Sequence, residues 1–291
     1  MRAEVAARPS ETAGTAPSAA AVATLRAIYI VWWRDLLRFW RDRWRLGASL
    51  AQPLLYLVVF GTGLGSALRG AGGGAFGTSY QQFLYPGVIG MSVLFTAIFG
   101  AMSIVWDREF GFLKELLVAP IDRSALAIGK TLGGSTQALL QGAILLVLAP
   151  FVGVKLGVLE VIELLMVIFL LAFSLSAMGV AIASRMRSMQ GFQVVMNFLM
   201  MPIFFLSGAL FPLVGLPSWM TVLTRLDPAA YGMDPLRRIS LSGSGLPPAV
   251  LDRIGITVFG QTLGMVSELA VLLAFGLAML AVAVVNFRRR D

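Results

Sequence analysis

Long apolar stretches dominate this chain, and most of the charged residues lie in the short segments between them. An α-helix rises about 1.5 Å per residue, so about 20 apolar residues cross the hydrocarbon core of a bilayer. Six stretches are long enough, at residues 46–66, 83–105, 132–152, 158–183, 192–211 and 265–287. The pattern predicts an all-α integral membrane protein with six transmembrane helices.

Basic residues are distributed unevenly between the two sides that these spans define. One side holds 17 of the 23 Lys and Arg residues, and four of the other six lie in the long segment 212–262. Positive charge in short loops stays in the cytoplasm, so both termini are predicted to be cytoplasmic. Residues 1–24, rich in Ala, Ser, Thr and Pro, are interpreted as a disordered tail. Residues 288–291 form a basic cytoplasmic end.

Residues 25–45 form an amphipathic pattern ahead of the first span. At helical spacing, one face holds Tyr29, Trp33, Leu36, Trp40 and Trp44, and the opposite face holds Arg34, Arg38, Arg41 and Arg45. A Trp-rich face against an Arg-rich face is typical of a helix in the headgroup layer. Two interpretations remain open, a plain membrane anchor and a lever that docks a cytoplasmic partner.

Residues 106–122 form a second amphipathic segment, interrupted by Pro120. Its apolar stripe comprises Trp106, Phe110, Leu113 and Leu117, and charged residues including Asp107 and Arg108 point elsewhere. A cytoplasmic helix is therefore predicted here. Phe112 projects on the charged side, and an aromatic among charges is typical of a protein interface. Packing of Phe112 on another loop of the same chain is the alternative.

The segment 212–262 is apolar in places but too broken by Pro to cross the membrane. We expect it to fold back into the outer interface as a re-entrant segment, with Trp219 at headgroup level, and to cap a pathway. Asp227 and Asp234 within it each precede a Pro. They are interpreted as turn or cap residues rather than as an acid pair for hydrolysis.

Composition narrows the chemistry. Only 13% of residues are charged, against about 25% in soluble domains. The chain has no Cys and no His, which removes thiolate chemistry and the commonest general base. The net charge of +8 is attributed to orientation in the membrane rather than to nucleic-acid binding. Gly129-Lys130-Thr131 lacks the rest of a phosphate-binding loop, so no nucleotide, cofactor or metal site is predicted.

The predicted spans contain almost no ionisable residues in their interiors. Ion-driven transporters need such groups, so a transporter built from these spans would receive its energy from outside them. Polar residues do occur within the spans, and they bond between helices or contact a substrate. The substrate-pathway candidates are Gln137, Gln141, Gln193, Asn197 and Ser207.

The arrangement of spans and two motifs carry a resemblance. REFGFLKELLVAPIDRSALAIGK at 108–130 and FPLVGLPSWMTVLTRLDPAAYGMDPLRR at 211–238 resemble characteristic segments of the ABC-2 type permease family. The likeness runs from about residue 25 to the C-terminus. Within the family, the sequence is most similar to daunorubicin-resistance and nodulation-factor exporters.

The resemblance implies a non-enzymatic permease subunit of an ATP-driven exporter in a bacterial cell membrane. ATP and Mg²⁺ would be bound by a separate ATP-binding subunit, present in two copies. A second permease copy, identical or different, would complete the complex, and the substrate would be a drug, lipid, glycolipid or polysaccharide. The implied contacts with the ATP-binding subunit are Arg34, Arg38, Arg41, Arg108, Glu109, Phe112, Lys114 and Glu115.

Two other classes of function stay open at this point. A secondary transporter or channel would work without a partner and respond to protons or voltage. An enzyme or assembly factor for envelope lipids would act without ATP, although the absence of His and Cys disfavours catalysis.

Overall fold

The computed structural model describes residues 17–70, 79–110, 122–211, 213, 215–243, 255–258 and 261–289. These residues are mostly helical, and strands β1 (Thr257–Val258) and β2 (Gln261–Thr262) pair antiparallel. The helices are α1 (Pro17–Arg41), α2 (Arg43–Gly70), α3 (Tyr80–Gly100), α4 (Met102–Glu109), α6 (Arg123–Leu146), α7 (Ala149–Val152), α8 (Val158–Ala183), α9 (Met189–Leu206), α10 (Ser218–Leu226), α11 (Ala230–Ser242) and α13 (Met265–Arg288).

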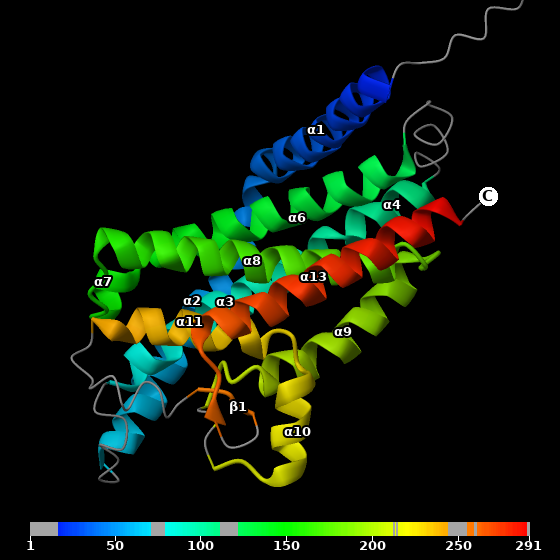
Figure 1. Cartoon of the computed structure of the whole chain (residues 1–291). Coiled ribbons are helices and arrows are strands. Elements are labelled where there is room, and N and C mark those ends of the chain that lie inside the picture. The colour runs from blue at the N-terminus through cyan, green and yellow to red at the C-terminus, as the bar shows by residue number, and fades with distance from the viewer. Residues whose placement is uncertain are drawn as a thin grey trace, which may run out of the picture.

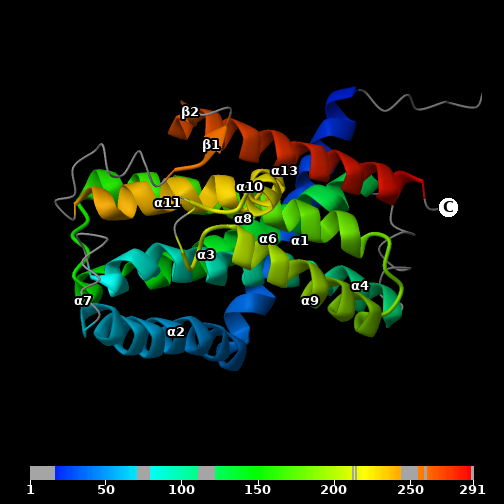
Figure 2. The same cartoon turned by 90° about the horizontal axis from the view of Figure 1, so that it is seen from below.

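The long helices form a bundle with α6 and α8 at its centre (Figures 1 and 2). α6 packs against α1, α3, α8 and α13, and α8 packs also against α3 and α11. α2 lies against α3, whereas α9 contacts mainly α3 and α4. The helices α2 and α9 are therefore peripheral and leave large apolar surfaces exposed, including Leu55, Val58 and Phe198.

Within the part of the chain that the structure describes, five helical segments are long and apolar enough to cross a membrane: Gly47–Ser66, Tyr80–Glu109, Val158–Ala183, Met189–Leu206 and Met265–Arg288. They correspond to five of the six predicted stretches. The second comprises α3 and α4, with the helix interrupted at Ala101. The fourth, Met189–Leu206, ends at Leu206 rather than at residue 211, where the predicted stretch 192–211 ends. Gly208, two residues later, has a φ of 78°, a left-handed conformation that an α-helix cannot continue through.

The remaining predicted stretch, 132–152, is displaced along the chain. Its helix, α6, begins at Arg123 and ends at Leu146, and it is not among the five apolar segments. It has 24 residues, enough to rise about 36 Å. Gly, Ser, Thr and Gln lower its apolar content, and most of them are buried against neighbouring helices. Small and polar residues suit such a position because they permit close packing and bonds between helices.

Helix α1 begins at Pro17, within the predicted tail, and ends at Arg41, with Asp42 separating it from α2. It has three faces rather than the predicted two. A buried stripe at helical spacing packs on α6 and comprises Ala27, Val31, Asp35 and Phe39. Trp33 and Trp40 are exposed by 43% and 66%, so the Trp-rich side is free to contact headgroups.

Two glycines allow α1 to approach α6 closely. A Cβ on Gly129 would lie 2.8 Å from Val31 Cβ, and one on Gly133 would lie 3.2 Å from Asp35 Cβ. Farther along the same face, Trp32 Nε1 donates a hydrogen bond of 3.0 Å to Thr136 Oγ1. Small residues of this kind are typical of helix seams in membrane proteins. The seam fixes α1 to the bundle, as its crossing over α6 in Figure 1 illustrates.

The outer segment contains one exposed and one buried helix. On α10, Trp219 is 64% exposed, whereas α11 is almost wholly buried against α3, α8 and α13. The Asp227 carboxylate accepts a hydrogen bond from Ala229 N at 2.9 Å, which confirms its predicted turn role. The same prediction is wrong for Asp234. Its buried carboxylate is paired with Arg238 at 2.6 Å, because α11 is packed too deeply for a solvated turn.

The predicted cytoplasmic helix 106–122 is described only as far as Phe110, because 111–121 lie outside the described residues. Within α4, Trp106 and Phe110 are exposed, by 46% and 59%. Asp107, which we expected on a solvated charged face, is instead 2% exposed and points into the protein. The reason is a buried lysine on α6 that pairs with it.

A candidate substrate cavity

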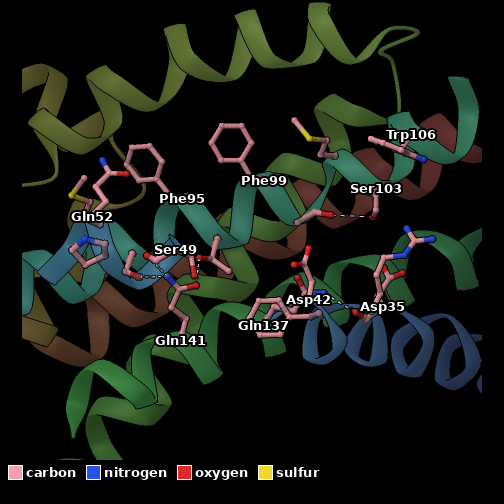
Figure 3. Close-up of a pocket in the computed structure, with 18 residues that line it drawn as sticks. Asp35, Asp42, Ser49, Gln52, Phe95, Phe99, Ser103, Trp106, Gln137 and Gln141 are labelled. Atoms are coloured by element: carbon pink, nitrogen blue, oxygen red, sulfur yellow. Dashed lines mark hydrogen bonds between the residues drawn. The ribbon is translucent and has the colours of Figure 1, made fainter. Parts of the chain in front are cut away.

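A cavity of about 780 Å³ lies between α1, α2, α3, α4 and α6 (Figure 3). Its lining combines aromatic, amide, hydroxyl and charged side chains. The lining residues are Asp35, Arg38, Phe39, Asp42, Ser49, Gln52, Pro53, Met91, Ser92, Phe95, Thr96, Phe99, Gly100, Met102, Ser103, Trp106, Gln137 and Gln141.

Pro53 determines one part of the polar wall. It lies inside α2 and has no N–H, so the carbonyl of Ser49, four residues earlier, loses its helical partner. Gln141 on α6 replaces that partner, donating from Nε2 to Ser49 O at 3.0 Å. The amide therefore satisfies a backbone acceptor that the bilayer could not.

The other contacts of Gln141 reach α3. Its Nε2 donates to Ser92 Oγ at 2.7 Å, and its Oε1 accepts from Thr96 Oγ1 at 2.7 Å. Gln141 is 2% exposed. Its polar atoms are thus engaged by α2 and α3, which makes it a structural member of the wall.

The opposite wall is aromatic. The rings of Phe95 and Phe99 on α3 lie 6.4 Å apart, and the Trp106 ring on α4 lies 4.9 Å from that of Phe110. Figure 3 shows Phe95 and Phe99 across the cavity from Gln141 and Asp35. A molecule in this space would meet a flat apolar surface on one side and hydrogen-bonding groups on the other.

The cavity borders a buried cluster of charged residues. Lys130 Nζ lies 3.1 Å from Asp35 Oδ2 and 3.2 Å from Asp107 Oδ2, and it donates to Ser103 Oγ at 2.9 Å. Arg34 adds a second cation, with its NH2 group 3.2 Å from Asp107 Oδ2. Two cations and two carboxylates balance, as burial requires. Asp35 and Ser103 belong both to this cluster and to the cavity lining.

The structure brings together only two of the five predicted substrate-pathway residues. Gln137 and Gln141 line the cavity. Gln193 and Asn197 lie on the exposed face of α9, away from it. Ser207 is buried at the end of α9, where its hydroxyl donates to Phe204 O at 2.8 Å.

The predicted partner contacts on α1 divide into inward and outward residues. Arg34 turns inward to Asp107, and 37% of its side chain is exposed. Arg38 is exposed at the rim of the cavity, and Arg41 is exposed at the end of α1. The surface available to another protein on this helix is therefore narrower than the Arg pattern predicted.

The predicted contacts after the second span are engaged within the chain where they are described. Arg108 donates to the carbonyls of Ser184, at 3.0 Å, and of Met186, at the C-terminal end of α8. Glu109 accepts from Met189 N at 2.9 Å, at the start of α9. Both charges match the helix dipoles that they face. Phe112, Lys114 and Glu115 lie outside the described residues.

Sequence reasoning missed the charged cluster. Lys130 precedes the predicted span 132–152, yet the structure places it inside α6 with 1% of its side chain exposed. One signal was present, because Asp35 interrupts the apolar spacing of Val31 and Phe39 on α1. An acid within a buried stripe indicates a buried basic partner. The sequence did not identify that partner, which is 95 positions away.

The chain is similar in sequence to known proteins. A family model described as ABC-2 type transporter matches residues 26–241, from α1 to the end of α11. The chain is 29% identical over 222 residues to nodulation protein J of Rhizobium leguminosarum bv. trifolii, covering 76% of this chain and 80% of the relative.

Two further relatives have similar coverage. The inner membrane transport permease YadH of Escherichia coli K12 is 28% identical over 209 residues, covering 70% of this chain and 79% of YadH. A protein named ycf38 in Cyanophora paradoxa is 26% identical over 215 residues, covering 73% of each chain. The residues matched by the family model, 26–241, include all those that line the cavity.

Proposed function

Because the chain belongs to the ABC-2 type transporter family, we propose that it is the membrane-spanning permease subunit of an ATP-driven exporter. A separate subunit binds ATP and Mg²⁺, and this chain binds no cofactor. The position of Lys130 supports the assignment of ATP binding to a separate subunit. It lies within a helix, paired with Asp35 and Asp107, and so has no part in a phosphate-binding loop.

The cavity is the observation that carries the proposal. It has the size of a small-molecule site, and its two walls differ in polarity. With cytoplasmic termini, the junction of α1 with α2 and the end of α4 face the cytoplasm, so the cavity lies in the inner half of the membrane. An amphipathic substrate (a drug, lipid, glycolipid or polysaccharide) enters here from the cytoplasm or the inner leaflet.

The proposed topology has six spans, namely the five apolar segments and, in addition, α6. Its polar composition is accommodated because other helices, rather than lipid, surround it. The buried helix α11 is proposed to be the re-entrant segment, shielded from lipid by α3, α8 and α13. Both termini lie in the cytoplasm of a bacterium, whose cell membrane the chain crosses.

Two ATP-binding subunits and a second permease, identical or related, complete the proposed exporter. The exposed apolar faces of α2 and α9 are available to the second permease and to lipid, and Phe198 on α9 is 82% exposed. Arg38 and Arg41 on α1, together with the segment that begins after Phe110, are proposed to contact the ATP-binding subunit. Arg34 and Arg108 support this surface through contacts within the chain, because their side chains turn inward.

Reconstitution tests the proposal. The chain would be co-purified with its ATP-binding subunit, and movement of a fluorescent short-chain lipid across liposomes would be measured. We expect movement only with hydrolysable ATP. Phe99→Ala should weaken lipid stimulation of hydrolysis because it removes part of the aromatic wall. Phe151→Ala, at an 85% exposed position on α7, is the matched control.

Two results would contradict the proposal. Transport by the chain alone, driven by a proton gradient or voltage, would indicate a secondary transporter or channel. Chemical turnover of an envelope lipid by the chain without ATP would indicate an enzyme.

A further inference from the structure

Lys130 lies where three helices meet. Its ammonium group contacts Asp35 on α1, and Ser103 and Asp107 on α4, while Lys130 itself belongs to α6. α6 is the central helix of the bundle, and α4 leads directly to residue 111. The Lys130 ammonium group therefore connects α6 with α1 and with α4. α1 is the helix predicted at the headgroup layer, and α4 leads to the proposed contact with the ATP-binding subunit.

These ion pairs are costly to separate because all three groups are buried. Lys130 has 1% of its side chain exposed, and Asp35 and Asp107 have 6% and 3%. Separating a buried ion pair leaves an uncompensated charge, which is strongly unfavourable. A displacement of α4 is therefore transmitted to Lys130 and Asp35 rather than absorbed by breaking the cluster.

The helix connection above the cluster permits such a displacement. The chain departs from regular α-helix at Ala101, between α3 and α4, where Ala101 N donates to Ile98 O at 3.1 Å. A short turn of tighter helix inside a long helix often marks a hinge, so Ala101 is the point about which α4 would pivot relative to α3. Phe95 and Phe99 of the cavity lining lie on α3, whereas Ser103 and Trp106 of the lining lie on α4. Motion of α4 relative to α3 therefore changes the shape of the cavity.

We infer that Lys130 is a positioning residue, which couples the shape of the cavity to the position of α4. The inference rests on the proposed function, and it assigns the coupling to one buried group. Gln137 reinforces the link on the cavity side, donating from Nε2 to Asp35 O at 3.2 Å. Substrate in the cavity and ATP hydrolysis in the partner communicate through this cluster.

A charge-neutral variant tests the inference without leaving an unpaired buried charge. Lys130→Met would be combined with Asp107→Asn, because removing both members of a buried ion pair is far less disruptive than removing one. Asp35 then keeps Arg34 as a partner, 3.8 Å away. Lys155→Met, at an exposed position between α7 and α8, is the matched control. Abundance, co-purification of the ATP-binding subunit, ATP hydrolysis and lipid transport would be measured for each.

We expect the double variant to be inserted, to retain the ATP-binding subunit and to hydrolyse ATP at the wild-type basal rate. Transport per ATP should fall by about tenfold or more, within the range that coupling between sites spans, and lipid stimulation of hydrolysis should be lost. A wild-type ratio of transport to hydrolysis would overturn the inference. Absence of ATP-dependent transport in the wild-type complex would instead overturn the proposed function.

A milder variant decides the matter if the double variant is not recovered. Arg34→Gln removes the partly exposed member and leaves Asp107 paired with Lys130. We expect a severalfold loss of transport per ATP with normal co-purification, and no loss with Arg26→Gln, at an exposed position on the same helix. Equal ratios for Arg34→Gln and Arg26→Gln would overturn the inference.

Discussion

At the scale of single residues, buried polar side chains compensate for backbone groups that helices leave unpaired. Gln141 satisfies the Ser49 carbonyl opposite Pro53, Arg108 satisfies carbonyls at the end of α8, and Arg237 satisfies those of Gly208 and Ala209 after α9. An unpaired carbonyl is costly in lipid because no water can replace its partner. These side chains were candidates for substrate or partner contact or were counted as loop charges, and the structure gives them architectural contacts.

Removing the Gln141 amide should therefore reduce stability. Gln141→Leu leaves Ser49 O without a partner and breaks the bonds to Ser92 and Thr96. We expect a loss of about 1–3 kcal/mol in the free energy of unfolding, measured by denaturation of the detergent-purified chain. Gln193→Leu, on the exposed face of α9, is the control and should change it by less than about 0.5 kcal/mol. Equal stability of the two variants would refute this account.

At the scale of elements, the seam between α1 and α6 determines where the N-terminal helix lies. The amphipathic pattern predicted a helix in the headgroup layer, but it did not predict contact with the bundle. That contact depends on Gly129 and Gly133, which are 98 or more positions from the α1 residues that they face. Close approach then brings Asp35 within reach of Lys130.

Adding one methyl group should loosen this seam. Gly129→Ala places a Cβ 2.8 Å from Val31 Cβ, so α1 must shift. We expect faster trypsin cleavage after Arg26 and a loss of about 1–3 kcal/mol in the free energy of unfolding. Gly47→Ala, on α2 with open space around its Cβ, is the control and should be neutral or stabilising by up to roughly 1 kcal/mol. Unchanged cleavage in Gly129→Ala would contradict the packing role.

The segment after α4 carries a prediction that rests on its sequence. Phe112→Ala should leave the permease at normal abundance but weaken its association with the ATP-binding subunit by about 2 kcal/mol, the cost of truncating a central aromatic anchor. Glu115→Ala should have a smaller, salt-dependent effect, because exposed charges are screened. Co-purification normalised to permease level measures both. Wild-type recovery with Phe112→Ala would remove this residue from the interface.

At the scale of the whole molecule, the distribution of basic residues predicts sidedness. A reporter fused after Asp291 or inserted near Ser188 should be active in the cytoplasm, and one inserted near Gly73 should be active outside. The same experiment tests whether α6 spans the membrane, because Gly73 and Ser188 are separated by three spans only if α6 is counted. Activity of both reporters on one side would contradict the six-span topology.

The sequence by itself determined the membrane class, the family and the approximate positions of five spans. These properties depend on runs of apolar residues and on local charge, which are readable within a window of about 20 positions. It located α6 only approximately, because a helix surrounded by other helices needs no apolar surface.

Only the tertiary structure decided the cavity, the burial of α11 and the pairing of Lys130. Each depends on residues far apart in the chain, such as Asp35 and Lys130, separated by 95 positions. A charged residue near a span end has the same local pattern whether it faces water or a buried partner. Packing determines which, because burial is tolerated only where an opposite charge is brought within bonding distance.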